Sequence, residues 1–478
     1  MPTPSPVPSP IPAADMPALP PGWVWTTVGE IAPVNQRNST LRELPDTTEV
    51  TFVPMAAVDA ESGSIQKPES RLLGQVRKGF TSFSEGDILF AKITSCMENG
   101  KVAIARGLIN QLGFGSTEFH TLRPSRSVIA EWLFYYVRQQ SFRDEAELSF
   151  SGTAGQLRVP TKFLDNHPFP LPPLAEQHRI VAAIETQLTR LDAGVASLKA
   201  AKAKLKRYRA SVLKAACEGR LVAQDANDEP AGMKDEGGGR KDEGRGRKGK
   251  RTKEPAMPDT VGLPELPTGW CWATAEQLCD FITKGTTPSA DKLYESIGDV
   301  PYIKVYNLTH QGMLDFSIRP TFIDKKTHLQ ELARSRVFPG DVLMNIVGPP
   351  LGKVSIVPST HPEWNINQAI AIFRPLSGFD RKYLSLCLLT DSILNWAVRR
   401  AKATAGQFNL TLEICRDLPI PLPPLAEQRR IVAEVERLLS VVTALEATVT
   451  ANLKRAERLR QSILKRAFEG KLVAQDEG

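Results

Sequence analysis

The chain contains the same segment twice, and this duplication constrains its fold more than any other feature of the sequence. Residues 171–188 (LPPLAEQHRIVAAIETQL) and 422–439 (LPPLAEQRRIVAEVERLL) are identical at thirteen of eighteen positions, 251 residues apart. The same separation relates EGRLVAQD at 218–225 to EGKLVAQD at 469–476. Any fold of this chain must therefore contain two copies of one framework.

Shorter repeats mark the start and the interior of each half. The matching pairs are LPPGW (19–23) with LPTGW (266–270), GDIL (86–89) with GDVL (340–343), and TAGQ (153–156) with TAGQ (404–407). Between these anchors the two interiors, roughly 150 residues each, differ almost completely. A solenoid would repeat a shorter and more uniform unit. The pattern indicates one scaffold that carries two different variable modules.

The shared segments predict two long helices. Prolines precede each segment and then stop, and an acidic residue in the first turn favours a helix start there. Apolar residues then recur in alternating steps of three and four, which is the seam of a coiled coil. The predicted seam consists of Ile180, Ile184, Leu188, Leu191, Leu198, Leu205, Ile431, Val435, Leu438, Val442, Leu445 and Leu459. Each helix should hold about 40–45 residues and extend roughly 60–65 Å.

We predict an α+β fold in which two mixed α/β variable domains are joined by two long helices. The helices form an antiparallel coiled coil, because antiparallel pairing relates the halves by a pseudo-twofold axis. The expected segments are a Pro-rich N-terminal extension (1–18), the first variable domain (19–170), the first spacer helix (171–224), a flexible charged linker (225–258), the second variable domain (259–421) and the second spacer helix (422–478).

Each interior predicts strands, short helices and polar turns. Residues 86–106 and 340–357 both indicate two strands joined by a turn, and residues 131–138 and 383–398 indicate helices. Polar side chains in such turns can pair with base edges, although ordinary structural turns explain them equally well. The candidate DNA-binding residues are Lys92, Thr94, Ser95, Lys101, Ser116, Thr117, Thr153, Gln156, Asn345, Lys353, Asn367, Gln368, Thr404, Gln407 and Asn409.

Net charge does not decide the function. The formal charge of +7 hints at an acidic partner, but residues 234–253 of the linker alone contribute +5, so the folded parts are nearly neutral. We interpret this stretch as a solvated tether rather than a DNA-binding arm. The basic distal halves of both helices fit a solvated face as well as a contact with DNA phosphate or an acidic partner surface.

The sequence contains no recognisable catalytic or metal motif. GPPLGK at 348–353 has one residue too few between its glycines for a phosphate-binding loop, and Val354 follows where Ser or Thr is required. The six histidines lack metal-ligand spacing, and six scattered cysteines indicate free thiols. No apolar run is long enough for a membrane span and the N-terminus lacks signal-peptide features, so we expect a cytoplasmic, non-catalytic protein without a metal.

The duplicated order of variable domain, PLPPLAEQ-led helix, linker, variable domain and PLPPLAEQ-led helix resembles the DNA-specificity subunit of a type I restriction–modification system. GSTEF at 115–119 with Leu122-Arg123-Pro124, and NQAI at 367–370 with Phe373-Arg374-Pro375, resemble a frequent recognition-domain stretch. The resemblance covers about residues 19–478 apart from the linker. Any one motif is weak, and their duplicated order is specific.

The resemblance implies a function and a set of partners. Each recognition domain would read one half of a bipartite, asymmetric target in double-stranded DNA, and the helices would set the spacing and bind two methyltransferase subunits. Restriction/translocase subunits would join for cleavage. No cofactor is expected on this chain, whereas S-adenosylmethionine, ATP and magnesium are expected on the partners. The alternative from the residues alone is a coiled-coil scaffold protein whose two modules do not bind DNA.

Overall fold

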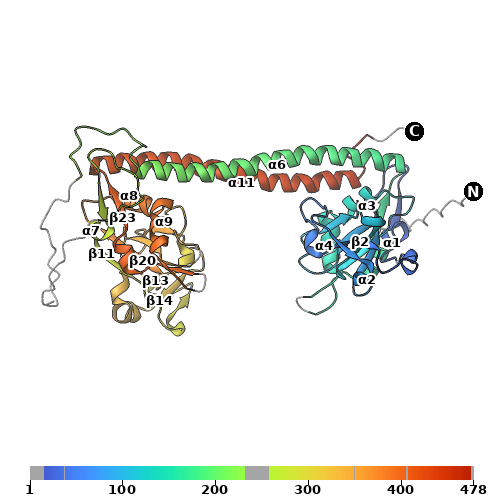
Figure 1. The fold of residues 1–478 in the computed structure, drawn as a ribbon, viewed down its shortest axis with the longest axis horizontal. Coiled ribbons are helices and arrows are strands. Elements are labelled where there is room, and N and C mark those ends of the chain that lie inside the picture. Colours follow the sequence, from blue (N-terminus) through green and yellow to red (C-terminus); the bar gives the residue numbers. More distant parts are fainter. Residues whose placement is uncertain are drawn as a thin grey trace, which may run out of the picture. The chain divides into compact units, whose positions relative to one another are not determined.

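Two continuous helices of 44 residues, α6 (Leu174–Cys217) and α11 (Leu425–Phe468), are the longest elements of the structure (Figure 1). Contacts divide the chain into unit 1, residues 1–199 and 450–478, and unit 2, residues 200–449. Each helix therefore contributes one end to each unit. The helix lengths agree with the sequence prediction.

The computed structural model describes residues 16–36, 38–153, 156–231, 258–348, 350–404 and 407–474. Most of the predicted Pro-rich extension, and residues 232–257 of the predicted linker, lie outside the described residues.

Unit 1 combines small sheets with short helices, as its mixed sequence pattern predicts. Its strands are β1 (Val24–Thr27), β2 (Glu49–Val53), β3 (Glu69–Leu72), β4 (Thr81–Ser84), β5 (Ile88–Ala91), β6 (Val102–Ile104), β7 (Leu112–Gly115), β8 (Phe119–Leu122) and β9 (Pro168–Leu171). Its short helices are α1 (Val28–Ile31), α2 (Leu73–Val76), α3 (Ala130–Val137), α4 (Gln140–Leu148) and α5 (Thr161–Asn166). The strands form sheets in the orders β3-β2-β7-β4, β6-β5-β8 and β1-β9.

Unit 2 repeats this plan with added strands. Its strands are β10 (Cys271–Thr274), β11 (Cys279–Lys284), β12 (Tyr294–Glu295), β13 (Val300–Ile303), β14 (Thr321–Ile323), β15 (Arg336–Val337), β16 (Val342–Asn345), β17 (Val347–Gly348), β18 (Val354–Ile356), β19 (Trp364–Ile366), β20 (Ile370–Pro375), β21 (Lys402–Thr404), β22 (Gln407–Asn409) and β23 (Pro419–Leu422). Its short helices are α7 (Ala275–Leu278), α8 (Arg381–Leu388), α9 (Asp391–Arg400) and α10 (Leu412–Arg416). The sheet orders are β11-β20-β16-β18, β12-β14-β13-β19-β15, β17-β22-β21 and β10-β23.

The two units share one topology despite their different sequences. The parallel pair β2–β7 in unit 1 corresponds to the parallel pair β13–β19 in unit 2. The antiparallel strand pairs predicted from the sequence form in both units, β5 with β6 and β16 with β18. These correspondences confirm the predicted α+β class and the internal repeat.

The second predicted interior helix, residues 383–398, is wrong as a single element, because the chain forms α8 and α9 with a break between them. Thr390 is extended at the start of α9, and its hydroxyl donates to the carbonyl oxygen of Cys387 at 2.6 Å. A threonine that bonds the preceding turn in this way interrupts a helix although the apolar spacing continues across it.

The long helices pair in antiparallel fashion, as predicted. In unit 2, Arg209 Nη2 of α6 lies 3.2 Å from Glu446 Oε2 of α11. In unit 1, Asp192 of α6 forms an ion pair with Arg460 of α11. The residue number rises along one helix while it falls along the other, which defines antiparallel pairing. Arg209 and Arg460 thus face the neighbouring helix instead of forming only a solvated basic face.

The predicted seam of α11 needs one correction. Val435, Val442, Val449, Ala456 and Ile463 are all buried and recur every seven residues. Leu445 and Leu459, however, are each 48% exposed. The positions one residue later carry Glu446 and Arg460, whose ion pairs occupy the interface. The apolar spacing predicted the two leucines in the seam because it takes only apolar residues into account and leaves out the charged residues next to them.

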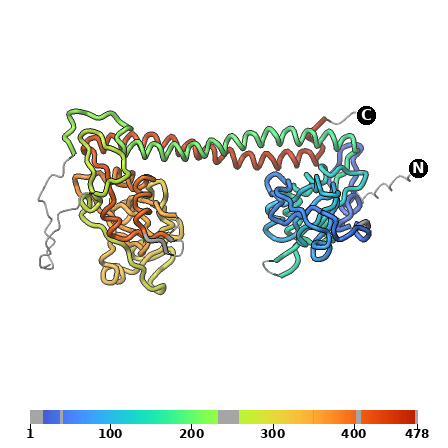
Figure 2. Tube along the Cα trace, in the orientation of Figure 1, coloured from blue at the N-terminus to red at the C-terminus, as the bar shows by residue number. Residues whose placement is uncertain are grey.

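Each long helix ends inside the hydrophobic core of one unit. Ile463, Leu464, Ala467 and Phe468 of α11 belong to the core of unit 1, where the Phe468 ring lies 4.0 Å from that of Trp132. The last turns of α6 belong to the core of unit 2 in the same way, with the Cys217 and Cys387 sulfurs 3.6 Å apart. Figure 2 shows this by colour, with the red end of α11 beside blue segments of unit 1.

The repeated LPxGW and LAEQ motifs meet at the start of each long helix. In unit 2 the Trp270 indole N–H donates to Glu427 Oε2 at 2.9 Å, and both side chains are buried. Gly269 has φ +85° in the turn that places Trp270, a conformation that glycine adopts without strain. In unit 1, Trp23 and Glu176 are buried at the corresponding positions, but Trp23 Nε1 has no acceptor among the described residues. The burial of both side chains is therefore common to the two halves, whereas the hydrogen bond is found in unit 2.

The glutamine of the LAEQ motif fixes the helix that lies against it. Gln177 Oε1 accepts from the Ile129 amide at the start of α3 at 2.9 Å, and its Nε2 donates to the carbonyl oxygens of Ser127 and Pro172. Gln428 repeats the contact with the Asp380 amide at the start of α8. A helix start has unsatisfied amides, so a buried glutamine there satisfies groups that water cannot reach.

The GD and RP motifs form a buried ion pair in each unit. Arg123 binds both oxygens of Asp87 at 2.8 and 2.7 Å, and Arg374 binds both oxygens of Asp341 at 2.8 Å. Both aspartates are almost fully buried. These motifs therefore hold the framework together, since a bidentate pair fixes two strands in one geometry.

Both described ends of the predicted linker are attached to unit 2. Arg430 binds both oxygens of Asp228 at 3.2 and 2.5 Å, and the Ala231 amide donates to the Gly269 carbonyl oxygen at 3.0 Å. On the other side, the Trp396 indole donates to the Asp259 carbonyl oxygen at 3.0 Å. The flexible stretch predicted at 225–258 is therefore too long, because residues 225–231 belong to the folded unit.

We predict that the charge on Glu427 destabilises unit 2 at neutral pH. Burial raises the pKa of Glu427 above its ordinary range, although the Trp270 hydrogen bond opposes the shift. As the pH rises, Glu427 loses its proton in the unfolded chain before it does so in the folded chain. The neutral carboxyl group therefore stabilises the folded state fully below the unfolded pKa of about 4.3, and this stability is lost as the pH rises through the folded pKa. Glu427→Gln should lose less stability than the wild type between pH 4.5 and 7, as measured by urea midpoints. The exposed Glu413→Gln variant is the control, and equal losses in wild type and Glu427→Gln would contradict the prediction.

Candidate DNA-recognition surface

Three loops of unit 1 come together at one place and carry most of the predicted DNA-binding residues of that half. The Lys92 amide donates to the Glu118 carbonyl oxygen and the Thr94 amide to that of Leu157, both at 2.9 Å. Ile93 also forms a bridge with Arg158. The predicted residues brought together are Lys92, Thr94, Ser95, Ser116, Thr117, Thr153 and Gln156. Ser95, Thr117, Thr153 and Gln156 are exposed there.

Unit 2 builds the same arrangement from β17, β22 and β21. The Ile346 amide donates to the Ala369 carbonyl oxygen at 2.8 Å, and Asn409 pairs with both Val347 and Lys402. The predicted residue Asn409 lies in β22, and Asn367 and Gln368 lie in the turn between β19 and β20, directly before Ala369. Gln368 and Asn409 are exposed, whereas Asn367 is half-buried. For Thr404 and Gln407 the structure describes only the backbone, which places them in β21 and β22.

Sequence reasoning missed an ion cluster in the unit 1 loops. Arg158 binds both oxygens of Glu118 at 2.8 Å, beside the half-buried Lys92. Burial lowers the pKa of Lys92 and Glu118 opposes that shift, while the Arg158 hydrogen bonds lower the pKa of Glu118. Burial also lowers the pKa of His120, which favours its neutral form. The cluster keeps one net positive charge, which suits a phosphate oxygen.

The same backbone positions carry no charge in unit 2. Ile346, Ala369 and Asn409 stand where unit 1 has Lys92, Glu118 and Arg158, as the matching main-chain bonds show. Two units with one framework therefore present different chemistry at their loops. Two halves of this kind can recognise two unlike sequences, since hydrogen bonds to base edges depend on the side chains presented.

Three predicted DNA-binding residues make hydrogen bonds within their own unit. Asn345 is fully buried, donates from Nδ2 to the Pro350 carbonyl oxygen and accepts from the Lys353 amide. Lys353 Nζ donates to the Val305 carbonyl oxygen at 3.4 Å, and Lys101 Nζ donates to that of Met55 at 3.0 Å. Each of these polar groups is thus engaged within its own unit, and their contact with DNA stays a prediction. A polar residue in a turn frequently bonds its own loop in this way.

The structure gives no sign of a metal centre in the part of the chain that it describes. Within that part, no three His, Cys, Asp or Glu side chains are grouped so that they could hold a metal ion. The six cysteines are all free. Neither the long helices nor any other described helix has the apolar length needed to cross a bilayer.

Comparison with known proteins identifies the family. The family described as "Type I restriction modification DNA specificity domain" matches residues 20–207 and 267–455, one match in each half. These stretches cover more than half of the chain, and the chain therefore belongs to this family of DNA-specificity proteins.

Individual relatives agree with this assignment. The chain is 29% identical over 480 residues to the type I restriction enzyme EcoEI specificity subunit of Escherichia coli, covering 90% of this chain and 80% of the relative. It is 26% identical over 477 residues to the EcoAI specificity subunit of the same species, covering 90% and 79%. Both relatives span the two halves of this chain.

Solved structures share the fold. A chain from a study of complex assembly and conformational transition of the type I R-M system matches with a TM-score of 0.72 at 23% identity, covering 95% of this chain and all of that one. The HsdS subunit from Thermoanaerobacter tengcongensis matches with a TM-score of 0.54 at 22% identity, covering 96% of this chain and all of the subunit.

We predict that Lys92→Ala weakens DNA binding several-fold and lowers the slope of log affinity against log salt by about one unit, because one phosphate contact is lost. Fluorescence anisotropy with duplex DNA at a series of salt concentrations measures both quantities. Lys101→Ala is the matched control, because its ammonium group is bound to a carbonyl oxygen. The control should lose thermal stability and keep the salt slope. An unchanged slope for Lys92→Ala would remove this residue from the interface.

Proposed function

We propose that the chain is the DNA-specificity subunit of a type I restriction–modification complex and reads a bipartite, asymmetric target in double-stranded DNA. One observation carries this proposal: two units repeat the same framework contacts but differ in the side chains at their loops. The family match supports it. The alternative of a scaffold protein without DNA binding is not favoured by these relatives.

In this function each unit reads one half-site. The loops of unit 1 offer a cationic cluster at Lys92 and Arg158, and unit 2 offers neutral groups such as Asn409 at the same positions. Phosphate contacts set position along the duplex, and base-edge contacts from exposed polar side chains set the sequence. Because the two units recognise different sequences, the complete target lacks palindromic symmetry.

The chain supplies recognition and spacing, and its partners supply the chemistry. We infer that two methyltransferase subunits bind this chain and carry S-adenosylmethionine for methylation of adenine. Restriction/translocase subunits would bring ATP and magnesium for cleavage. A methyltransferase that acts on a base inside a duplex must extrude that base, so the specificity subunit needs to place the enzyme rather than contribute a catalytic group.

The first prediction concerns the modularity of recognition. Replacing residues 19–170 by another recognition domain of the family should change one half-site and leave the other unchanged, because the framework contacts are the same in each unit. Long-read sequencing of modified bases in a host carrying each gene shows the methylated motif directly. A host without the gene is the control and should lack methyladenine in the split motif. A change in both half-sites would contradict separate reading by the two units.

The second prediction concerns the helices as a spacer. We consider an insertion of seven residues after Ala200 and of seven after Ala451. These two positions face each other, because the residue numbers of facing residues on the two helices add up to the same total. Seven residues add about 10.5 Å, which corresponds to roughly three base pairs. The gap in the methylated motif should grow by about that amount. Insertion into α6 alone breaks the pairing and should abolish methylation, whereas an unchanged gap in the double insertion would refute the spacer role.

A further inference from the structure

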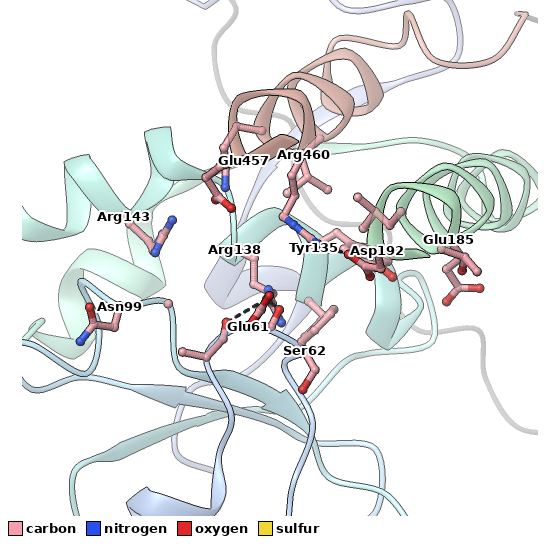
Figure 3. A pocket seen from close by; sticks show the side chains of 17 residues that line it. Glu61, Ser62, Asn99, Tyr135, Arg138, Arg143, Glu185, Asp192, Glu457 and Arg460 are labelled. Carbon is pink, nitrogen blue, oxygen red and sulfur yellow. Dashed lines mark hydrogen bonds and ion pairs between the residues drawn. The ribbon is translucent and has the colours of Figure 1, made fainter. Parts of the chain in front are cut away.

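A cavity of about 410 Å³ lies within unit 1 and is polar (Figure 3). Its walls come from the loop at 60–62, the turn at 99–100, helices α3 and α4, and both long helices. Arg138 and Arg143 line it, and we call it the arginine cavity. The loop surface described above for DNA recognition involves none of its lining residues.

Arg138 is held in this cavity without a carboxylate partner. Its Nη2 donates to the carbonyl oxygens of Ala60 at 3.1 Å and Glu61 at 2.7 Å, and its guanidinium lies 5.0 Å from the Phe134 ring centre. Its Nη1 is buried and has no acceptor among the described residues. Burial and the neighbouring Arg460 lower the pKa of Arg138 to about 10. The positive charge is thus fixed in place and not neutralised.

Arg143 lines the same cavity and repeats this situation (Figure 3). Its Nη1 donates to the Glu98 carbonyl oxygen at 2.9 Å and its Nη2 to Gln140 Oε1 at 2.6 Å, which are both neutral acceptors. Its Nε is buried and has no acceptor in the part of the chain that the structure describes. Two arginines therefore line one cavity, and each has one buried N–H without an acceptor among the described residues.

The acidic residues around the cavity do not compensate these charges. Glu61 forms an ion pair with Lys199 at 2.8 Å, and Asp192 forms one with Arg460. Glu185 and Glu457 are exposed, and an exposed carboxylate is screened by water. Glu457 raises the pKa of Arg143, but burial outweighs it and the net shift is downward.

Unit 2 shows that the framework does not require these arginines. Leu389 and Leu394 stand at the positions of Arg138 and Arg143, since α8 and α9 begin 251 residues after α3 and α4. The glycines that pack against these side chains support the same correspondence between the units. Gly63 lies against Arg138 as Gly312 lies against Leu389, and Gly100 lies against Arg143 as Gly352 lies against Leu394. The same backbone thus packs with leucines in unit 2 and leaves two unneutralised cations in unit 1.

We propose that the arginine cavity binds one small phosphate-bearing anion per chain. Guanidinium groups match phosphate geometry better than any other side chain, and hydrogen bonds to a charged acceptor are the strong ones. The cavity volume accommodates a phosphate or a polyphosphate. A bound anion would accept hydrogen bonds from the two guanidinium groups that line the cavity and would fix α3 and α4 against the long helices. This site is separate from the loops that carry the proposed function, so its failure would leave that function intact.

The test uses the purified full chain and three probes: inorganic phosphate, pyrophosphate and ATP without magnesium. Isothermal titration calorimetry should show one site per chain for at least one probe. At ten times the dissociation constant, the melting temperature should rise by about 3 °C or more. The double variant Arg138→Leu/Arg143→Leu carries the residues of unit 2, and it should fold and show neither effect. The exposed pair Arg126→Leu/Arg190→Leu removes the same charge elsewhere and should bind like the wild type.

Several results would overturn the proposal. They are no binding of any probe, two sites per chain, or equal binding by the wild type and the leucine variant. If the double variant does not fold, Arg143→Gln alone should bind about tenfold more weakly while melting as the wild type does without anion. If no small probe binds but the leucine variant loses affinity for duplex DNA, the arginines contact the DNA backbone and the small-anion site is refuted.

Discussion

The structure depends on where the two long helices end. The last turns of α11 complete the hydrophobic core of unit 1, and the last turns of α6 complete the core of unit 2. Burying side chains such as Ile463 and Phe468 removes apolar area from water, and each fully buried side chain of this size contributes about 1.5–3 kcal/mol. Neither unit has a complete core without a helix end from the other half of the sequence. Each unit therefore folds together with the end of a long helix that begins in the other unit.

The repeated motifs specify this junction, and the variable residues lie elsewhere. Trp270 and Glu427 join the start of unit 2 to the start of α11, and Gln428 fixes α8 beside them. The Arg374–Asp341 pair then holds two strands of the sheet. The glutamine contact and the Arg–Asp pair are present in both halves, and the loops differ around them, as Lys92 and Ile346 do at equivalent positions.

The sequence predicted the framework well because its signals are periodic or repeated. It predicted the two helices, the strand pairs and the mixed α/β class. It misplaced Leu445 and Leu459, because apolar spacing cannot show that Glu446 and Arg460 find partners on the other helix. It also joined α8 to α9, because the apolar pattern runs on through Thr390, whose hydroxyl bonds the preceding turn.

The candidate site was predicted less completely, for a physical reason. The loops around Lys92 were found from their polar turns, but Glu118 and Arg158 come from distant segments that only the fold brings together. Asn345, Lys101 and Lys353 have the right chemistry for DNA, yet their polar groups are bonded within the unit. Residue type shows what a side chain can bind, whereas its neighbours decide whether it is available.

The exchange of helix ends also sets an order of events during synthesis. Unit 2 is formed by one continuous stretch, residues 200–449, whereas unit 1 needs residues 1–199 together with 450–478. Domains generally fold as units as the chain leaves the ribosome, N-terminal parts first. Here that order is reversed, because the core of unit 1 lacks Ile463 and Phe468 until the end of the chain has been made. The half of the protein that is translated first is the half that is completed last, and until then its apolar core surface remains open to chaperones and to other nascent chains.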